Sequence, residues 1–504
     1  MNPSSSLDRR SFLASAGAGA ATLALLPPSA GATDTPVRRG KLIEPGRKLN
    51  IACIGCGGKG VSDIAGVSSE NIVALCDVDS VQAKQVFGRY PAVPKYQDYR
   101  KMLREMDAQI DAVTISTPDH THHAAGMLAI SMGKHVFIQK PLARTIGETR
   151  ELLLAARRHG VVTQMGNQGH AGEGVRLARE WVRAGLIGTV HEVHVWTRKM
   201  ELGPYKSSRK DRPTPGETPP ATLEWNLWNG TAPSRPYSVE YVPRRWRNWW
   251  DFGCGALGDI GCHTMDAPFY ALDLGAPATV QADCAPFNEE TFPDWSVITY
   301  EFAARGERPA VRLVWHDGGK LPPRPPGLEE GRTFEERYGY YRVGDGGVIY
   351  DPSEKCSSPR LLPEARMRAA TVPAKTIPRV PGGDPFQEWI NACKGGPAPG
   401  SNFEYAAPLT EMVLLGNVAL RARGRKVRWE AESKRLASAS VTVAGDHVFH
   451  AKQLNGSGFH PRIMSKTGAR GYASLDRWRA ARCDWPNPSS PCVSPSSPSC
   501  FSPC

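Results

Sequence analysis

Short apolar runs alternate with stretches of helical periodicity along the first third of the chain. The apolar runs are rich in β-branched residues and lie at 51–54, 72–75, 112–115, 135–138 and 161–165. The helical stretches lie between them, at 62–66, 80–87, 99–106, 122–132 and 145–158. This alternation predicts a parallel sheet with helices on both faces. Ligands of such sheets bind at the carboxyl ends of the strands, so polar residues there are the first candidates for a site.

The pattern changes after about residue 185. Alternating or β-rich runs follow without regular helices between them, at 190–197, 279–285, 296–302 and 310–316. A period of two indicates half-buried strands. These runs predict a second domain of the α+β class, built on a larger, mostly antiparallel open sheet.

The first apolar run leads directly into a G-x-G-x-x-G motif. An acid, Asp77, ends the next run, and the motif itself comprises Gly55, Cys56, Gly57, Gly58, Lys59 and Gly60. Glycines here permit a tight turn, close approach to a pyrophosphate and close helix packing, and a helix N-terminus favours phosphate. Asp77 is placed to bind ribose hydroxyls and to repel a 2′-phosphate. The sequence therefore predicts an NAD-binding Rossmann domain over 49–168, with NADP less favoured, and an α/β substrate domain over 169–432.

Two further strand ends carry polar residues. The third apolar run leads into Thr117, Pro118, Asp119 and His120, and the fourth into Gln139, Lys140 and Pro141. Their position favours contact with the nicotinamide half of the cofactor. The histidines at 120, 122 and 123 would equally suit a helix start with solvated side chains. Their spacing does not place all three on one helical face, so no metal site is predicted.

Candidate substrate residues come from loop position and spacing. Five tryptophans between 223 and 250 fit either core packing or the flat faces that hold sugar rings. Asp259 and His263 are four apart and share one face if their segment is helical, although a buried histidine or a metal-ligand pair fits the same spacing. Loop position alone, with ordinary packing as an equal alternative, selects Tyr96, Asn167, His170, Trp225 and Arg247.

The N-terminal segment has the regions of an export signal in order. Arg9 and Arg10 precede an Ala/Gly/Leu run, and a small-residue cleavage site follows at 30–32. This predicts a twin-arginine signal peptide over 1–32, a linker over 33–48 and a periplasmic or secreted location. The apolar run is too short for a stable membrane span.

Composition narrows the function classes. The net charge of +12 comes from scattered basic residues, which disfavours a nucleic-acid partner. The twelve cysteines include no second C-x-x-C pair to complete a metal site with Cys53 and Cys56, so we interpret these two as small apolar residues. Residues 433–504 end in a Pro/Ser/Cys-rich segment whose composition predicts a disordered tail.

Together these motifs resemble the glucose–fructose oxidoreductase, inositol dehydrogenase and MocA (Gfo/Idh/MocA) family, particularly its exported bacterial branch. The resemblance runs from about residue 49 to 429. It rests on the glycine motif with Asp77, on residues 117–120 and 139–141, and on the G-x-x-x-D-x-G-x-H sequence at 255–263. It implies a Rossmann domain followed by an α/β domain whose open sheet often mediates homodimers or tetramers.

The resemblance also implies roles for single residues. Lys140 would hydrogen-bond the reacting hydroxyl and the nicotinamide ribose, with a cis bond to Pro141. His263 would be the general base and Asp259 would orient it or bind substrate hydroxyls, which fits a reaction that needs a base titrating near neutrality. Gln139 departs from the family's Glu, and losing that carboxylate makes the ammonium form of Lys140 less favoured.

The function expected is hydride transfer between a tightly bound NAD and a hydroxyl or ketone of a sugar, cyclitol or glycoside. Free NAD is scarce outside the cytoplasm, so an exported enzyme would have to keep and regenerate its cofactor. One alternative is an NAD-dependent glycosidase that oxidises C3 transiently, eliminates the aglycone and shows no net redox change. A second alternative is a catalytically silent sugar-binding protein that retains the nucleotide.

Overall fold

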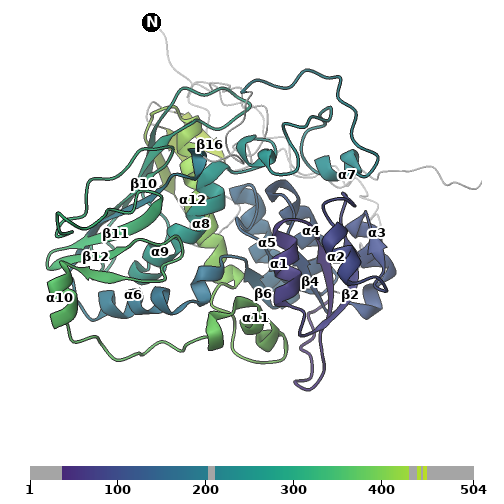
Figure 1. The fold of residues 1–504 in the computed structure, drawn as a ribbon, viewed down its shortest axis with the longest axis horizontal. Helices are drawn as coiled ribbons and strands as arrows, with labels where there is room; N and C mark the ends of the chain where they lie inside the picture. Colours follow the sequence, from purple (N-terminus) through teal and green to yellow (C-terminus); the bar gives the residue numbers. More distant parts are fainter. Residues whose placement is uncertain (1–36, 202–209, 431–439, 444–446, 451–504) are drawn as a thin grey trace, which may run out of the picture. The chain divides into compact units, whose positions relative to one another are not determined.

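Two β-sheets, one from each half of the chain, organise the molecule (Figure 1). The structure is a computed structural model, and it describes residues 37–201, 210–430, 440–443 and 447–450. The predicted signal peptide, the start of the predicted linker and most of the predicted tail lie outside these residues. Contacts divide the chain into units 1–460 and 461–504, and every described residue belongs to the first unit.

The first sheet has six parallel strands in the order β3-β2-β1-β4-β5-β6. Its strands are β1 (Asn50–Ile54), β2 (Asn71–Cys76), β3 (Lys95–Tyr96), β4 (Ala112–Ile115), β5 (His135–Ile138) and β6 (Thr163–Met165). This is the doubly wound order of a dinucleotide-binding domain, and it confirms the predicted Rossmann sheet. The sequence pattern gives no signal for β3, which is only two residues long.

Five helices connect these strands (Figure 1). They are α1 (Lys59–Gly66), α2 (Lys84–Arg89), α3 (Tyr99–Glu105), α4 (Asp119–Ser131) and α5 (Ile146–His159). The fourth helix begins three residues earlier than expected, because Pro118 supplies the extended residue that precedes a helix. The second begins later than expected, because the carboxylate of Asp79 accepts backbone N–H groups of a turn before Lys84.

The second sheet has ten strands in the order β13-β12-β11-β7-β10-β9-β8-β14-β15-β16. Neighbouring strands are antiparallel except β7 and β10, which confirms the larger, mostly antiparallel sheet. Its strands are β7 (Val190–Thr197), β8 (Thr279–Cys284), β9 (Ser296–Phe302), β10 (Val311–His316), β11 (Tyr338–Gly344), β12 (Gly347–Asp351), β13 (Arg360–Leu362), β14 (Val427–Glu430), β15 (Ser440–Val443) and β16 (His447–His450). The last two lie in the segment expected to be a disordered tail, so there the sheet continues instead.

The second half of the chain also contains helices, most of which the sequence pattern does not reveal. Its helices are α6 (Glu173–Arg183), α7 (Trp225–Asn229), α8 (Gly255–Thr264), α9 (Asp266–Leu272), α10 (Glu364–Ala369), α11 (Pro385–Cys393) and α12 (Phe403–Arg421). Every residue of α8 is buried, so this helix has no polar face that a periodicity would show. Within the described residues, no helix combines the length and the apolar character needed to cross a membrane.

One apolar cluster runs from the first sheet through α12 to the second sheet. It includes fully buried residues of all three layers, such as Ile115, Leu415 and Ile298. Arg150 of α5 pairs with Glu411 of α12 through two contacts of 2.7 Å. Trp429 of β14 donates its indole N–H to the same carboxylate at 3.0 Å. Groups at the junction of the two domains therefore have fixed positions.

A large buried side chain of α11 gives a test of this packing. Trp389 is 0% exposed and its ring meets Phe137 of β5 edge-on at 5.7 Å between centroids. We expect Trp389→Ala to lower the free energy of unfolding by about 3–5 kcal/mol, because it leaves a cavity. Denaturant unfolding measures this change. The control Val372→Ala, at a residue that is 46% exposed, should stay within about 0.5 kcal/mol of the wild type. An equal loss of unfolding free energy in both variants would contradict the buried packing of Trp389.

Candidate active site

The glycine motif forms the turn between β1 and α1. Gly55 has a φ of +86°, and a Cβ there would lie 2.6 Å from the carbonyl oxygen of Ser116. A Cβ at Gly60 would collide with the carbonyl oxygen of Gly55. A side chain at either position would push α1 away from the sheet. The motif is therefore needed for close packing of α1 on β1 and β4.

The N-terminus of α1 fits the pyrophosphate of a dinucleotide. No side chain caps the helix at Gly58. The backbone N–H groups of its first turn therefore keep the anion-binding character of an uncapped helix start. Residues 55–60 also carry only one side chain longer than cysteine, at Lys59, so the backbone is accessible to a ligand.

Asp77 follows β2 and holds the same turn from its other side. Its carboxylate accepts the N–H groups of Cys56 at 2.7 Å, Gly57 at 3.1 Å and Asp79 at 2.9 Å. Burial raises the pKa of Asp77, whereas these three hydrogen bonds act to lower it. The residue lines the cavity next to the turn. It thus both shapes the turn and is available to the hydroxyls of a ribose.

This cavity lies where β1, β2, β4 and β5 end, and α8 closes its other side. Its volume is about 630 Å³, which suits a small-molecule ligand. The predicted site residues in its wall are Gly55, Gly57, Gly58, Lys59, Asp77, Thr117, Pro118, Lys140, Arg247, Asp259 and His263. In the described part of the chain, no three metal-binding side chains are grouped as a metal site would require.

An ion pair joins the two domains at the cavity wall. Lys140 follows β5 and is linked to Pro141 by a cis bond, and its Nζ donates to Oδ1 of Asp259 in α8. The other carboxylate oxygen of Asp259 lies 3.3 Å from Nε of Arg247. The guanidinium of Arg247 is also 4.2 Å from the ring centroid of Trp246. One carboxylate thus positions two cations.

His263 lies one helical turn beyond Asp259 on α8. It is 8% exposed, and its Nδ1 has no hydrogen-bond partner among the described residues. Burial lowers the pKa of His263 well below its ordinary value, and the charge of Lys140 acts in the same direction. The imidazole is therefore neutral at neutral pH and presents an unbonded nitrogen.

Asp119 adds a titratable carboxyl to the same wall. It is the first residue of α4 and is 4% exposed. Burial raises the pKa of Asp119 to about 7, and the charge of Asp259 adds to this effect. The positive charges of Arg247 and Lys140 oppose it. Asp119 therefore exchanges its proton near neutral pH.

Two models of one protein family match the two domains. The model described as an oxidoreductase family with an NAD-binding Rossmann fold matches residues 49–167, and the model of the family's C-terminal alpha/beta domain matches residues 173–308. The chain belongs to the Gfo/Idh/MocA oxidoreductase family. Its first domain is accordingly an NAD-binding Rossmann domain.

Curated relatives match less than a third of this chain. Inositol 2-dehydrogenase from Burkholderia multivorans is 32% identical over 161 residues, which are 31% of this chain and 47% of that protein. The 1,5-anhydro-D-fructose reductase from Ensifer adhaerens is 34% identical over 111 residues, which are 22% of this chain and 33% of that protein. The chain thus spans less than half the length of these curated relatives.

Solved structures match both domains and show the fold. The WlbA dehydrogenase from Bordetella pertussis, in complex with NADH and UDP-GlcNAcA, is 16% identical with a TM-score of 0.53 and covers 77% of this chain and 100% of its own. The aldose-aldose oxidoreductase from Caulobacter crescentus, complexed with glycerol, is 18% identical with a TM-score of 0.51 and covers 76% of this chain and 100% of its own.

Not all predicted cofactor residues of this Gfo/Idh/MocA protein reach the cavity. The ring nitrogens of His120 lie 2.8 Å from the carbonyl oxygen of Trp228 and 3.3 Å from that of Phe252. His120 therefore joins α4 to the tryptophan-rich segment. Two members of the glycine motif are also outside the wall, namely Cys56 and Gly60.

The structure places most of the loop-selected substrate residues in buried contacts away from the cavity wall. Asn167 accepts a hydrogen bond from Ser401, and Nδ1 of His170 lies 3.0 Å from the carboxylate of Asp266. Trp225 stacks on other aromatic rings, and Tyr96 in β3 is likewise absent from the wall. Loop position brings a residue near a strand end, but it does not determine the direction of its side chain. Arg247 alone of this group lines the cavity.

The tryptophan-rich segment combines packing with cavity lining. Trp225 and Trp228 stack with 4.9 Å between ring centroids and 13° between ring planes, inside a buried aromatic cluster. Trp228 and Trp246 also line the cavity. Core packing is thus confirmed for Trp225 and Trp228, and the binding of sugar rings by Trp228 or Trp246 stays a prediction.

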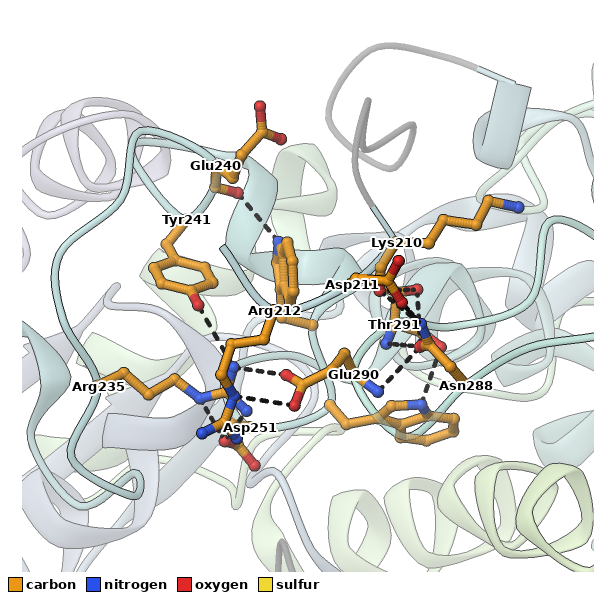
Figure 2. A network of polar contacts seen from close by, with 12 residues as sticks. Lys210, Asp211, Arg212, Arg235, Glu240, Tyr241, Asp251, Asn288, Glu290 and Thr291 are labelled. Carbon is orange, nitrogen blue, oxygen red and sulfur yellow. Dashed lines mark hydrogen bonds and ion pairs between the residues drawn. The ribbon is translucent and has the colours of Figure 1, made fainter. Parts of the chain in front are cut away.

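A buried charge cluster anchors this segment (Figure 2). Arg235 is 5% exposed and donates from Nε to Asp251 at 2.6 Å and from Nη1 to Glu290 at 2.6 Å. The hydroxyl of Tyr241 lies 3.3 Å from the same guanidinium. Two carboxylates around one arginine satisfy its charge inside the protein. Because Arg235 and Asp251 precede and follow Arg247 in the sequence, their contact holds both ends of the segment that carries Arg247 to the cavity.

The structure explains the glutamine in place of the family's Glu. The buried carboxylate of Asp63 in α1 accepts hydrogen bonds from Gln139 at 2.8 Å and Ser116 at 2.7 Å, and lies 2.6 Å from Nζ of Lys59. A glutamate at position 139 would place two carboxylates against each other. The amide of Gln139 donates a hydrogen bond where a carboxylate would repel Asp63, and the carboxylate beside Lys140 is that of Asp259.

Sequence reasoning missed several residues of the wall. These include Gln82, Lys199, Glu354 and Lys355. The first lies in a turn that the pattern suggested to be helical. The other three follow strands of the second sheet, where no motif marks the residues that point toward the first domain.

The buried carboxyl of Asp119 predicts a pH effect on stability. Its pKa of about 7 in the folded protein exceeds the value of about 3.9 for an unfolded chain. Between these values the folded state binds the extra proton, so the free energy of unfolding falls as pH rises from about 4 to 7. Asp119→Asn cannot ionise and should be more stable than the wild type at pH 8 by up to about 4 kcal/mol, and at pH 5 by only about 1.5 kcal/mol.

Thermal unfolding of both proteins at the two pH values measures this effect. Asp107→Asn is the matched control. The hydrogen bond from Arg38 holds the pKa of Asp107 below its ordinary value, so its stabilisation is complete above the unfolded pKa and should not change between pH 5 and 8. A constant difference between Asp119→Asn and the wild type across this range would contradict the assignment.

Proposed function

We propose that this protein is an NAD-dependent oxidoreductase that transfers hydride between the nicotinamide and a hydroxyl or ketone of a sugar or cyclitol. The observation that carries the proposal is the common cavity of the glycine turn and the group Lys140, Asp259 and His263. A dinucleotide bound along the turn and a substrate beside α8 would meet in this cavity.

The chain offers a binding group for each part of the cofactor. The N-terminus of α1 would hold the pyrophosphate, and Asp77 would hold the adenosine ribose. A carboxylate at position 77 opposes a 2′-phosphate, which favours NAD over NADP. When bound, NAD supplies the hydride acceptor for an alcohol or, as NADH, the donor for a ketone.

The protein groups would handle the proton and the charge on the reacting oxygen. Neutral His263, with its unbonded nitrogen, would accept the hydroxyl proton as hydride leaves the same carbon. The ammonium of Lys140 would stabilise the negative charge that develops on the oxygen. Asp259 would position Lys140 through the ion pair and limit its movement.

The sugar or cyclitol class follows from relatives as well as from the site. Two relatives are named as an inositol 2-dehydrogenase and a 1,5-anhydro-D-fructose reductase. The predicted twin-arginine signal would carry the folded protein out with its cofactor, and a tightly held cofactor would suit that route. The same cavity would also serve a glycosidase that uses NAD transiently, so the assay must separate the two reactions.

Removal of the lysine tests the chemistry. With NAD and myo-inositol or D-glucose, or with NADH and 1,5-anhydro-D-fructose, we expect a change in NADH absorbance matched by a stoichiometric keto or alcohol product. Lys140→Met should lower kcat at least about 100-fold while NAD still binds, because the reacting oxygen loses its cation. Lys101→Met, at a side chain that is 66% exposed on α3, should retain wild-type kcat.

Two outcomes would contradict this function. Release of nitrophenol from nitrophenyl glycosides without accumulation of NADH or a keto-sugar would show the redox-assisted glycosidase instead. Full turnover by Lys140→Met would remove the proposed role of the lysine.

A further inference from the structure

The loop between β12 and β13 brings a lysine to the cavity that the proposed reaction does not use. Lys355 lines the same wall as Lys140 and His263, and its side chain is exposed there. Among the described residues it has no hydrogen-bond or ion-pair partner. Four other cations of the wall each have a carboxylate partner, namely Lys59, Lys140, Lys199 and Arg247, whereas Lys355 and Arg244 have no ion pair among the described residues.

The charges around Lys355 compensate its positive charge only in part. Lys199 pairs with Glu354 at 2.7 Å, and Lys59 pairs with Asp63 at 2.6 Å. Asp259 is already shared by Lys140 and Arg247. Glu354 and Asp259 therefore each serve another cation, and Lys355 has no ion-pair partner among the described residues.

Hydrogen bonds within the loop hold the backbone around Lys355 in place. The carboxylate of Asp351 accepts the N–H groups of Ser353 and Ser358, each at 2.8 Å. Cys356, next to Lys355, is 1% exposed and has a φ of +53°, a left-handed conformation that costs about 1 kcal/mol for a residue other than glycine. Such strain persists where the surrounding structure imposes a particular backbone position.

The opposite side of this loop packs directly on the segment that follows β6. A Cβ at Gly169 would lie 2.9 Å from Cβ of Lys355. A Cβ at Gly174 would collide with the carbonyl oxygen of Cys356. The loop is thus held against the segment after β6, and Lys355 has a defined place at the cavity.

Lys355 interacts electrostatically with groups of the proposed reaction. Desolvation in the wall is the largest cause that lowers the pKa of Lys355, the charge of Glu354 opposes it, and the charges of Lys59, Lys199 and Lys140 lower the pKa further. Its own charge in turn helps to lower the pKa of His263. An anion bound here would relieve this repulsion between like charges.

We propose that Lys355 binds an anionic group of the substrate, so that the substrate is a sugar or cyclitol bearing a carboxylate or a phosphate. This inference rests on the proposed function, because it assigns the substrate to the wall that contains Lys140 and His263. The pyrophosphate of the cofactor has its own site at the N-terminus of α1. Lys355 then selects an acidic substrate over its neutral counterpart.

Calorimetry on the NADH-bound protein tests this selection with three probes: D-glucuronate, D-glucose 6-phosphate and D-glucose. We expect the wild type to bind one of the two acids at least about tenfold more tightly than D-glucose, and the preferred acid distinguishes carboxylate from phosphate. Lys355→Met should reduce this preference about tenfold, and Lys355→Arg, which keeps the charge, should retain most of it. Lys101→Met on α3 should keep the wild-type preference.

Three results would overturn the proposal. One is equal binding of acids and D-glucose by the wild type, and another is an unchanged preference in Lys355→Met. The third is a tenfold loss of NADH affinity in Lys355→Met with the preference intact, which would assign the lysine to the cofactor. If the protein bound an acid preferentially but neither oxidised nor reduced it with the cofactor, the proposed function would be wrong and the anion site would be supported. If it turned over neutral sugars and bound acids no more tightly, the proposed function would be supported and the anion site would be wrong.

Discussion

The ion pair between Lys140 and Asp259 is the contact on which the geometry of the cavity depends. Its two members come from different domains, one from the end of β5 and one from α8. A partly buried ion pair repays its desolvation only when further contacts support it. Arg247 and the continuous core under α8 supply that support. The pair therefore fixes the distance between the NAD-binding sheet and the helix that carries His263.

Burial gives each titratable group around this pair a different state. His263 is kept neutral, Asp119 exchanges its proton near neutrality, and Asp77 is surrounded by backbone N–H groups. These environments separate a proton acceptor from the groups that hold charge, which is how one cavity provides acid–base chemistry. Lys355, which has no ion-pair partner among the described residues, adds a positive charge to the wall of the same cavity.

The sequence predicted the first domain well because its signals are local. A strand, a glycine turn and an acid follow one another within about 30 residues, and each has a steric or electrostatic reason to be there. Lys140, Asp259 and His263 were found through motifs, and they line one cavity. The residues that sequence reasoning missed depend on long-range packing instead. Lys355 reaches the cavity because the strained loop after β12 packs on the segment that follows β6, and Asp63 meets Gln139 across 76 residues.

The most direct test of the account is a crystal structure of the protein grown with NAD. The glycine turn and the group of Lys140, Asp259 and His263 are proposed to contact one and the same dinucleotide. The account predicts the pyrophosphate at residues 55–60, the adenosine ribose at Asp77 and the nicotinamide beside Lys140. NAD bound elsewhere, or bound with its nicotinamide directed away from α8, would contradict it.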